Sequence, residues 1–183
     1  MVISSKELQI RTGKTLKVRC PKISDARAML DTYKTACTET RNLSREPDEF
    51  NISLDKEKLY IKTMNNAPRQ VLLLAVVDGE IAGSADIVQV SPLMRDRHRC
   101  SLGIMLKSKF TGLGIGTILL SEIFGLAKQL EYEQIELNVV ANNTGARKLY
   151  EKLGFEQTGL IPHGQKYSDG SYDDIVHMVK FLV

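Results

Sequence analysis

The stretch Thr111-Gly112-Leu113-Gly114-Ile115-Gly116-Thr117, the glycine loop, decides how the rest of this 183-residue chain is interpreted. An apolar, strand-like run ends before it at Leu106, and a long apolar stripe with helical spacing follows it. Glycines let a ligand approach the backbone closely, and they point several N–H groups at one place. The helix N-terminus behind them adds unpaired N–H groups and about half a positive charge. The loop therefore favours a phosphate or pyrophosphate site, and the alternative is a tight strand-to-helix turn without a ligand.

Two familiar phosphate-binding loops fit this stretch poorly. A dinucleotide-binding G-x-G-x-x-G that starts at Gly112 would need a glycine where Thr117 stands. Such a loop also opens a doubly wound domain, whereas here a series of strands precedes it. A P-loop ends in a lysine followed by serine or threonine, and no lysine occurs from Gly112 to Ala127. Both loops are therefore disfavoured.

Hydrophobic patterning predicts strands and helices between the N-terminus and the glycine loop. In chain order, we expect a hairpin or one long strand interrupted near Gly13, a helix capped by Ser24 and Asp25, a helix capped by Ser53, and strands over residues 70–77, 81–90 and 99–106. Asp78-Gly79 lies between two of these apolar runs, and this dipeptide is a strong signal for a two-residue hairpin turn. The three strands therefore form an antiparallel meander.

The chain after the glycine loop alternates between helices and strands. In order, we expect a helix over residues 114–131, a strand over 135–140, a short helix opened by Asn143 and stopped at Gly154, and strands over 155–161 and 174–182. The first of these helices connects two strands, and such a crossover is right-handed and makes its strands parallel neighbours. The last two strands are antiparallel if the turn at residues 168–170 joins them. A mixed sheet with helices on both faces follows.

Length and composition are those of one globular domain. Hydrophobic residues make up 43% of the chain, charged residues make up 26%, and the formal net charge is +3. Cys20, Cys37 and Cys100 show no C-x-x-C spacing, which predicts reduced thiols and no metal site. The N-terminus lacks the apolar core of a signal peptide, and the apolar run at residues 71–77 is too short to span a bilayer. We therefore expect a cytoplasmic protein without a membrane partner.

Two segments resemble motifs of the GNAT superfamily of N-acetyltransferases. Thr111 to Gly116 is similar to that family's Q/R-x-x-G-x-G/A motif, with Thr111 in place of the usual glutamine or arginine. Asn143 to Phe155 is similar to the family's N-x-x-A-x-x-x-Y-x-x-x-G-F segment. The expected order of elements is also the order that this family uses. The resemblance runs from near Thr15 to the C-terminus and implies one N-acetyltransferase domain over residues 1–183. The implied fold is the GNAT fold of the α/β (α+β) class, with a mixed, mostly antiparallel central sheet and helices on both faces.

The resemblance also implies acetyl-CoA as the acetyl donor and indicates which residues hold it. Backbone groups of Met105 and Leu106 would bind the pantetheine arm, and the N–H groups from Gly112 to Thr117 would bind the pyrophosphate. Asn143 would contact the cofactor where two parallel strands splay apart. Thr111 departs from the family's motif, but the backbone donors of the loop do not depend on that side chain.

Acetyl transfer to an amine has three chemical requirements: a proton must leave the amine, an oxyanion must be stabilised, and the departing sulfur must be protonated. Tyr150 would lie near the thioester sulfur and is the expected proton donor, the alternative being a packed aromatic residue on a helix face. Many relatives carry a glutamate on the strand before the glycine loop, where this chain has Ser101. Glu136 and Asn138 share one face of the following strand and are candidates for positioning a water that takes the proton. Each of these two is otherwise an ordinary strand residue.

The function that we expect is direct transfer of an acetyl group from acetyl-CoA to a primary amine in a ternary complex, because no cysteine is placed to form an acyl-enzyme. The acceptor is a protein N-terminus or a small amine, and a homodimer is compatible with the sequence. Three arginines between Met94 and Arg99 are typical of a solvated charged turn, so we expect no nucleic-acid partner. The main alternative is a non-catalytic acyl-CoA-binding module of the same fold, and a nucleotide-binding oxidoreductase comes third.

Overall fold

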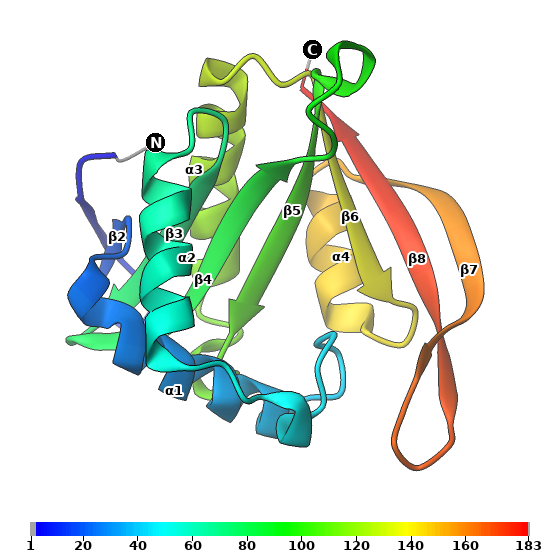
Figure 1. Ribbon diagram of the computed structural model, residues 1–183, viewed down its shortest axis with the longest axis horizontal. Helices are drawn as coiled ribbons and strands as arrows, with labels where there is room; N and C mark the ends of the chain where they lie inside the picture. The colour runs from blue at the N-terminus through cyan, green and yellow to red at the C-terminus, as the bar shows by residue number, and fades with distance from the viewer. Residues whose placement is uncertain (1–2, 183) are drawn as a thin grey trace.

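A sheet of eight strands in the order β1-β2-β3-β4-β5-β6-β8-β7 organises the computed structural model, which describes residues 3–182 (Figure 1). The strands are β1 (Lys6–Gln9), β2 (Thr15–Arg19), β3 (Val71–Val77), β4 (Glu80–Gln89), β5 (Arg99–Leu106), β6 (Gln134–Val140), β7 (Glu156–Lys166) and β8 (Tyr172–Phe181). The helices are α1 (Ala26–Glu39), α2 (Leu54–Asn66), α3 (Ile115–Gln129) and α4 (Thr144–Lys152). Neighbouring strands are antiparallel except β5 and β6, which confirms the mixed, mostly antiparallel sheet.

Helices cover both faces of the sheet, as the sequence predicted. In Figure 1, α1 and α2 lie on the face toward the viewer, and α3 and α4 lie on the face behind it. The core beneath α1 and α2 consists of Ala26, Met29, Ile61, Met64, Leu72, Leu74, Val76 and Ile81. The larger core, beneath α3 and α4, includes Ile115, Leu119, Ile123, Ile135, Tyr150 and Phe155. In the part of the chain that the structure describes, none of the helices combines the length and the hydrophobicity that a membrane span needs.

Turn residues explain two of the hairpins. Asp78 and Gly79 both have positive φ angles, 51° and 82°, as a type I′ turn requires, so the predicted β3–β4 hairpin is confirmed. Gly13 has a φ of 78° between β1 and β2, which pair antiparallel. The N-terminal segment is therefore a hairpin and not one long strand.

One predicted helix cap is wrong in its detail, and the other is confirmed. Asp25 occupies the N-cap position of α1, but its side chain does not bind the helix N–H groups. Arg19 donates to both carboxylate oxygens at 2.6 and 2.9 Å, and the N–H of Lys22 donates at 2.6 Å. The ion pair therefore takes the carboxylate that the cap would have used. At the start of α2, Ser53 accepts a hydrogen bond from the N–H of Lys56, as expected.

Strand β7 is longer than its predicted range. The strand that was expected to end at Ile161 continues to Lys166, with a register shift between Ile161 and Gln165. Pro162 follows directly after the predicted range, and proline has no N–H to give to a neighbouring strand. β7 is an edge strand of the sheet, however, so one side of its backbone has no strand to pair with. Proline is tolerated there, and the hairpin with β8 extends beyond it.

The parallel pair β5 and β6 separates soon after it begins. The crossover through α3 makes these two strands neighbours, as predicted, but they pair only from Arg99 to Ser101 with Gln134 to Glu136. Both strands continue beyond that point without pairing to each other, and Figure 1 shows them diverging toward α1. The backbone groups of β5 that face the separation are consequently left without a strand partner.

Candidate active site

A cleft of about 1440 Å³ opens where β5 and β6 separate. Residues 102–106 of β5 and 137–140 of β6 form its two edges. The glycine loop and α4 line one end, and α1, α2 and the segment between them line the other. The cleft therefore reaches both faces of the sheet and brings together elements far apart in sequence.

The glycine loop presents its backbone to this cleft. Gly112 and Gly114 have φ angles of 73° and 87°, a region that glycine adopts without strain, and Gly114 is the N-cap of α3. The side chain of Ile115 is fully buried, and Leu113 packs against the same core. The opposite side of the loop faces the cleft through Thr111, Gly112, Gly114, Gly116 and Thr117. The first N–H groups of α3 thus point toward open space, where an anion is stabilised by the helix dipole.

Arg11 lies beside the glycine loop, and sequence reasoning missed it. It comes from the β1–β2 turn, lines the cleft, and places its Nε 4.0 Å from where a Cβ on Gly114 would stand. The hydroxyl of Thr111, at the position where the family motif has glutamine or arginine, donates to the carbonyl of Ser108 at 2.7 Å. A cation is therefore available at the loop, but from a residue a hundred positions earlier in the chain.

The remaining predicted cofactor residues also line the cleft. Met105 and Leu106 lie on the part of β5 that has no β6 partner. Asn143 caps α4 by accepting from the N–H of Ala146 at 3.2 Å, which leaves its amide NH₂ group free to donate into the cleft. Leu113 and Ile115 are the exceptions among the predicted cofactor residues, because their side chains pack into the core instead of lining the cleft.

Tyr150 lies on α4 and faces the same cleft. Its side chain is buried, and its ring packs edge-on against Phe155 with 5.7 Å between the ring centroids. Burial raises the pKa of the Tyr150 hydroxyl to about 12, so the group stays protonated at neutral pH. The hydroxyl has no hydrogen-bond partner within residues 3–182. A donor that faces the cleft without a protein partner is available to a ligand.

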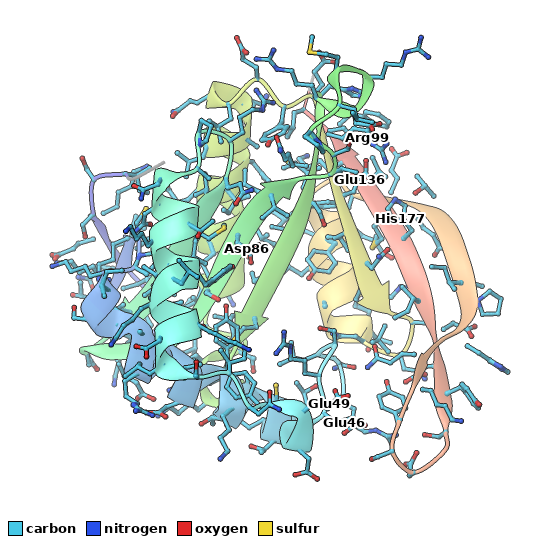
Figure 2. All side chains as sticks on the ribbon, viewed as in Figure 1. Glu46, Glu49, Asp86, Arg99, Glu136 and His177 are labelled. Atoms are coloured by element: carbon cyan, nitrogen blue, oxygen red, sulfur yellow. The ribbon has the colours of Figure 1, made fainter. Side chains whose placement is uncertain are left out.

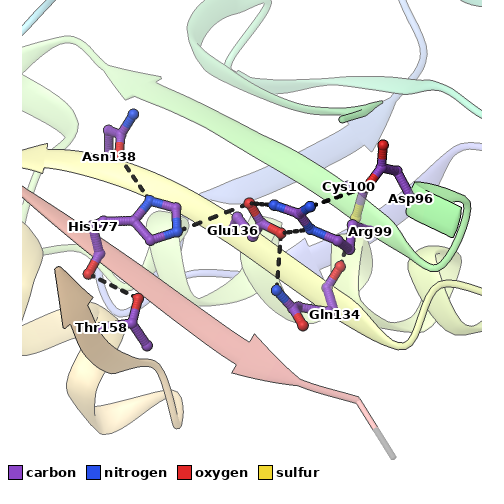
Figure 3. A network of polar contacts seen from close by, with 8 residues as sticks. All are labelled: Asp96, Arg99, Cys100, Gln134, Glu136, Asn138, Thr158 and His177. Carbon is purple, nitrogen blue, oxygen red and sulfur yellow. Dashed lines mark hydrogen bonds and ion pairs between the residues drawn. The ribbon is translucent and has the colours of Figure 1, made fainter. Parts of the chain in front are cut away.

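Glu136 is not among the residues that line the cleft and is held in a polar network (Figure 3). Arg99 forms a two-pronged ion pair with its carboxylate, Nε to Oε1 and Nη2 to Oε2, the second contact at 2.9 Å. Gln134 donates to Oε1 at 2.9 Å, and Nε2 of His177 lies 3.9 Å from Oε2. Burial alone would raise the pKa of this carboxyl, but the hydrogen bonds and the positive charge of Arg99 outweigh burial and hold the pKa below its ordinary value. This arrangement argues against Glu136 as the base.

Asn138 lies two residues after Glu136 on β6 and, unlike Glu136, lines the cleft. Its Oδ1 faces Nδ1 of His177 at 2.9 Å, so its carbonyl group is already engaged. The role predicted for Glu136 and Asn138, positioning a water that takes a proton, stays a prediction.

The Arg99–Glu136 pair makes a prediction about stability. Glu136→Gln should lower the free energy of unfolding by about 2 kcal/mol at pH 7, less than for a fully buried pair because Arg99 is one-third exposed. The folded-state pKa of Glu136 is depressed, so its contribution is present above the unfolded pKa of about 4.3 and is lost as the pH falls further. Urea unfolding at pH 7 and pH 3 measures this, with exposed Glu133→Gln as the control. An equal loss at both pH values would contradict the ion-pair account.

Four side chains at the other end of the cleft carried no recognisable signal in the sequence. Tyr33 on α1, Glu57 and Tyr60 on α2, and Asp86 on β4 all line it. They come from three elements, and their spacing in the sequence matches no motif. In Figure 2, Asp86 lies over β4, well apart from Arg99 and Glu136, which lie together where β5 and β6 begin.

Comparison with known proteins identifies relatives of the chain. A model of the acetyltransferase (GNAT) family matches residues 28–155. The L-amino acid N-acetyltransferase AaaT of Escherichia coli (strain K12) is 28% identical over 148 residues, covering 76% of this chain and 88% of that protein.

Solved structures share the whole fold. The acetyltransferase of the GNAT family from Streptococcus pneumoniae superposes with a TM-score of 0.86 at 26% identity, covering 91% of this chain and 99% of that one. The acetyltransferase yncA from Salmonella typhimurium, determined with its cofactor acetyl-CoA, gives a TM-score of 0.81 at 18% identity, covering 92% and 94% of the two chains.

Proposed function

The chain belongs to the acetyltransferase (GNAT) family, and from this premise we propose that it transfers the acetyl group of acetyl-CoA to a primary amine by direct attack in a ternary complex. The observation that supports this most strongly is the single cleft that joins the glycine loop, the unpaired edge of β5 and the Tyr150 hydroxyl. The loop supplies donors for phosphates, the strand edge supplies donors for amides, and the hydroxyl supplies a proton.

In this proposal the donor binds through backbone groups at two places. The N–H groups at residues 112–117 hold the pyrophosphate, since they donate no backbone hydrogen bond within residues 3–182 and lie at a helix N-terminus. Met105 and Leu106 pair with the amides of the pantetheine arm much as a strand would, because β6 has moved away from that edge. Asn143 donates its amide N–H to the cofactor beside the splayed strands.

Arg11 supplies the positive charge that position 111 lacks. Arg11→Ala should weaken acetyl-CoA binding about fivefold, or about 1 kcal/mol, because an exposed charge contributes only modestly in water. Titration calorimetry at low and high salt measures this, and the difference should shrink as salt rises. Arg27→Ala removes the same charge from an exposed position on α1 outside the cleft and should leave affinity unchanged. Equal effects of the two substitutions would mean that Arg11 acts only through net charge.

The reaction follows from these positions. The neutral amine nitrogen attacks the acetyl carbonyl carbon, a C–N bond forms, and the C–S bond breaks to release coenzyme A. The nitrogen gives one proton to solvent in this step. Tyr150 donates its proton to the departing thiolate and recovers it from solvent. A thiolate is a fair leaving group, with a thiol pKa near 8.5 for cysteine, so this proton assists the step without being indispensable.

The acceptor that we propose is the α-amine of an amino acid or of a protein N-terminus. The support for this is the relative of Escherichia coli, whose name describes acetylation of L-amino acids. The part of the cleft on the α1 and α2 side is open enough to admit such a group. We also propose that residues 1–183 act as one domain, and that the enzyme works in the cytoplasm, because its three cysteines are buried and form no disulfide within residues 3–182.

A thiol-release screen tests the proposed function. Acetyl-CoA is incubated with the protein and with L-amino acids, peptides carrying a free α-amine, polyamines or aminoglycosides, and the free thiol is measured. We expect release above hydrolysis with α-amines. Binding of acetyl-CoA without release for any amine would favour the non-catalytic acyl-CoA-binding module instead.

A further inference from the structure

Two carboxyl groups without partners face the cleft on its α1 and α2 side. The Asp86 side chain is half-buried and forms no hydrogen bond or ion pair with any residue from 3 to 182. Glu57 is 4% exposed, and its buried Oε1 also lacks a hydrogen-bond partner within the described chain. Buried carboxyl groups without partners are costly, so they are rarely kept for structure alone. Both residues line the cleft, where a ligand can complete their hydrogen bonds.

The strand opposite Asp86 makes room for its carboxyl group. Asp86 of β4 is the register partner of Gly103 on β5, two residues before Met105. A Cβ on Gly103 would stand 2.8 Å from Oδ1 of Asp86, too close for two real atoms. The carboxyl group therefore lies over β5, directly beside the strand edge that is proposed to hold the pantetheine arm.

Tyrosine and glutamate side chains surround Asp86, and Arg45 and Lys56 also line the cleft. Tyr33 faces it from α1, and the Tyr33 hydroxyl is paired with the Ser84 hydroxyl of β4 at 3.1 Å. Glu57 and Tyr60 approach from α2, and Gly103 lies on β5. Burial raises the pKa of Asp86 to about 6. A carboxylate in these surroundings is ionised at neutral pH yet basic enough to accept a proton.

We propose that Asp86 is the general base of the reaction, taking a proton from the acceptor ammonium, with Glu57 completing an anionic pocket that draws the ammonium in. This inference rests on the proposed acetyl transfer. The ammonium gives one proton to the Asp86 carboxylate, and the neutral amine then attacks the acetyl carbon. The nitrogen loses its second proton to solvent as the C–S bond breaks, Tyr150 protonates the sulfur and regains a proton from solvent, and Asp86 releases its own proton to solvent. One proton is released per turnover. Glu136, the carboxylate predicted from sequence, is bound to Arg99 instead.

Asp86→Asn tests the role of the carboxylate. With an alanine-initiated hexapeptide and free L-amino acids as acceptors, kcat/KM should fall about a hundredfold, as for the loss of a general base. The wild-type rate should decline as the pH falls through about 6, because the base must be ionised. The kcat/KM of the variant should instead rise about tenfold for each unit of increasing pH, since the variant uses only amine that is already neutral. An unchanged rate and an unchanged acid limb would overturn the proposal.

The thermal stability of the Asp86→Asn variant distinguishes a catalytic role of Asp86 from a structural role. The folded-state pKa of Asp86 is raised, so its ionisation destabilises the fold at pH 7, and Asp86→Asn should leave the melting temperature equal or higher. Asp55→Asn, on the exposed surface of α2 with its side chain 91% exposed, should change neither rate nor pH profile. Gly103→Ala displaces the carboxyl group without removing it and should also slow turnover, whereas Gly125→Ala, whose Cβ meets open space, should not. Wild-type rates in Gly103→Ala would count against the proposal.

A titration of the Asp86 carboxyl group in the absence of an acceptor tests the base assignment independently of the proposed acetyl transfer. The carboxyl ¹³C resonances of the free enzyme should include one that titrates near pH 6 and is missing in Asp86→Asn. A resonance of Asp86 that titrates near pH 4 would overturn the base assignment even if acetyl transfer is observed. If the titration is as expected but no amine is acetylated, the proposed transfer fails, and Asp86 is then not a catalytic base.

Discussion

Gly114→Val is expected to raise the Kd for acetyl-CoA by about a hundredfold or more while the chain still folds. Gly114 has a φ of 87°, and a β-branched residue there costs of the order of 1–3 kcal/mol in backbone strain. A relaxed loop would turn its N–H groups away from the phosphates, and each hydrogen bond to a charged group contributes about 1.5–3 kcal/mol. The loss of two such bonds gives the expected effect, which titration calorimetry measures.

Gly170→Val is the matched control for this substitution. Gly170 has nearly the same φ, 83°, and a Cβ on it meets open space, but it lies in the β7–β8 turn away from the cleft. Both variants therefore carry similar strain, and only the Gly114 variant should lose its affinity for acetyl-CoA. If a folded Gly114→Val protein binds acetyl-CoA as tightly as Gly170→Val, the glycine loop does not hold the pyrophosphate.

Tyr150→Phe is expected to lower kcat about a hundredfold with little change in the Kd for acetyl-CoA. The substitution removes one oxygen and keeps the ring that packs against Phe155. General acid catalysis contributes about 10² to 10⁴ in rate, and the lower end applies because a thiolate already leaves fairly well. The loss should appear in kcat because the proton is needed in the transition state. Steady-state kinetics with a verified acceptor measures it.

Tyr132→Phe is the control that distinguishes a tyrosine hydroxyl that stabilises the fold from one that donates a proton in the reaction. Tyr132 is also buried, but its hydroxyl donates to the carbonyl of Arg69 at 2.6 Å. Its removal should cost about 1 kcal/mol of stability and leave kcat unchanged. Tyr150→Phe should show the opposite pattern, because its hydroxyl has no partner within residues 3–182 to lose. Full turnover in Tyr150→Phe would make Tyr150 a packing residue and assign the proton to water or to another group.

Local patterns in the sequence were sufficient to predict the main helices and strands and the parallel pair in the sheet. Asp78-Gly79 specifies a turn through its own backbone preferences, and the glycine loop specifies a strand-to-helix transition in the same way. Helical spacing gave α3 and α4, and the crossover rule then made β5 and β6 parallel. Each of these inferences needs only residues close together in the chain.

The surroundings of Asp86, Arg11 and Glu136 were not predictable by such means. Asp86 and Arg11 acquire their roles from residues opposite them, Gly103 and Gly114, which only the folded sheet brings near. The Arg99–Glu136 ion pair was missed for the same reason: a search for carboxylates on a strand face does not reveal that Arg99 lies on the neighbouring strand and binds one of them. The packing of the folded chain creates these contacts, and the sequence of one strand does not reveal them.

Transfer of a labelled acetyl group tests the central claim most directly. Acetyl-CoA carrying ¹³C in the acetyl group is incubated with the protein and with α-amines, and mass spectrometry and NMR then locate the label. The account predicts an acetyl amide on the acceptor nitrogen, formed in equal amount to the free thiol and absent with Gly114→Val. Tight binding of acetyl-CoA by the wild-type protein, with no label on any acceptor beyond the rate in buffer, would contradict it.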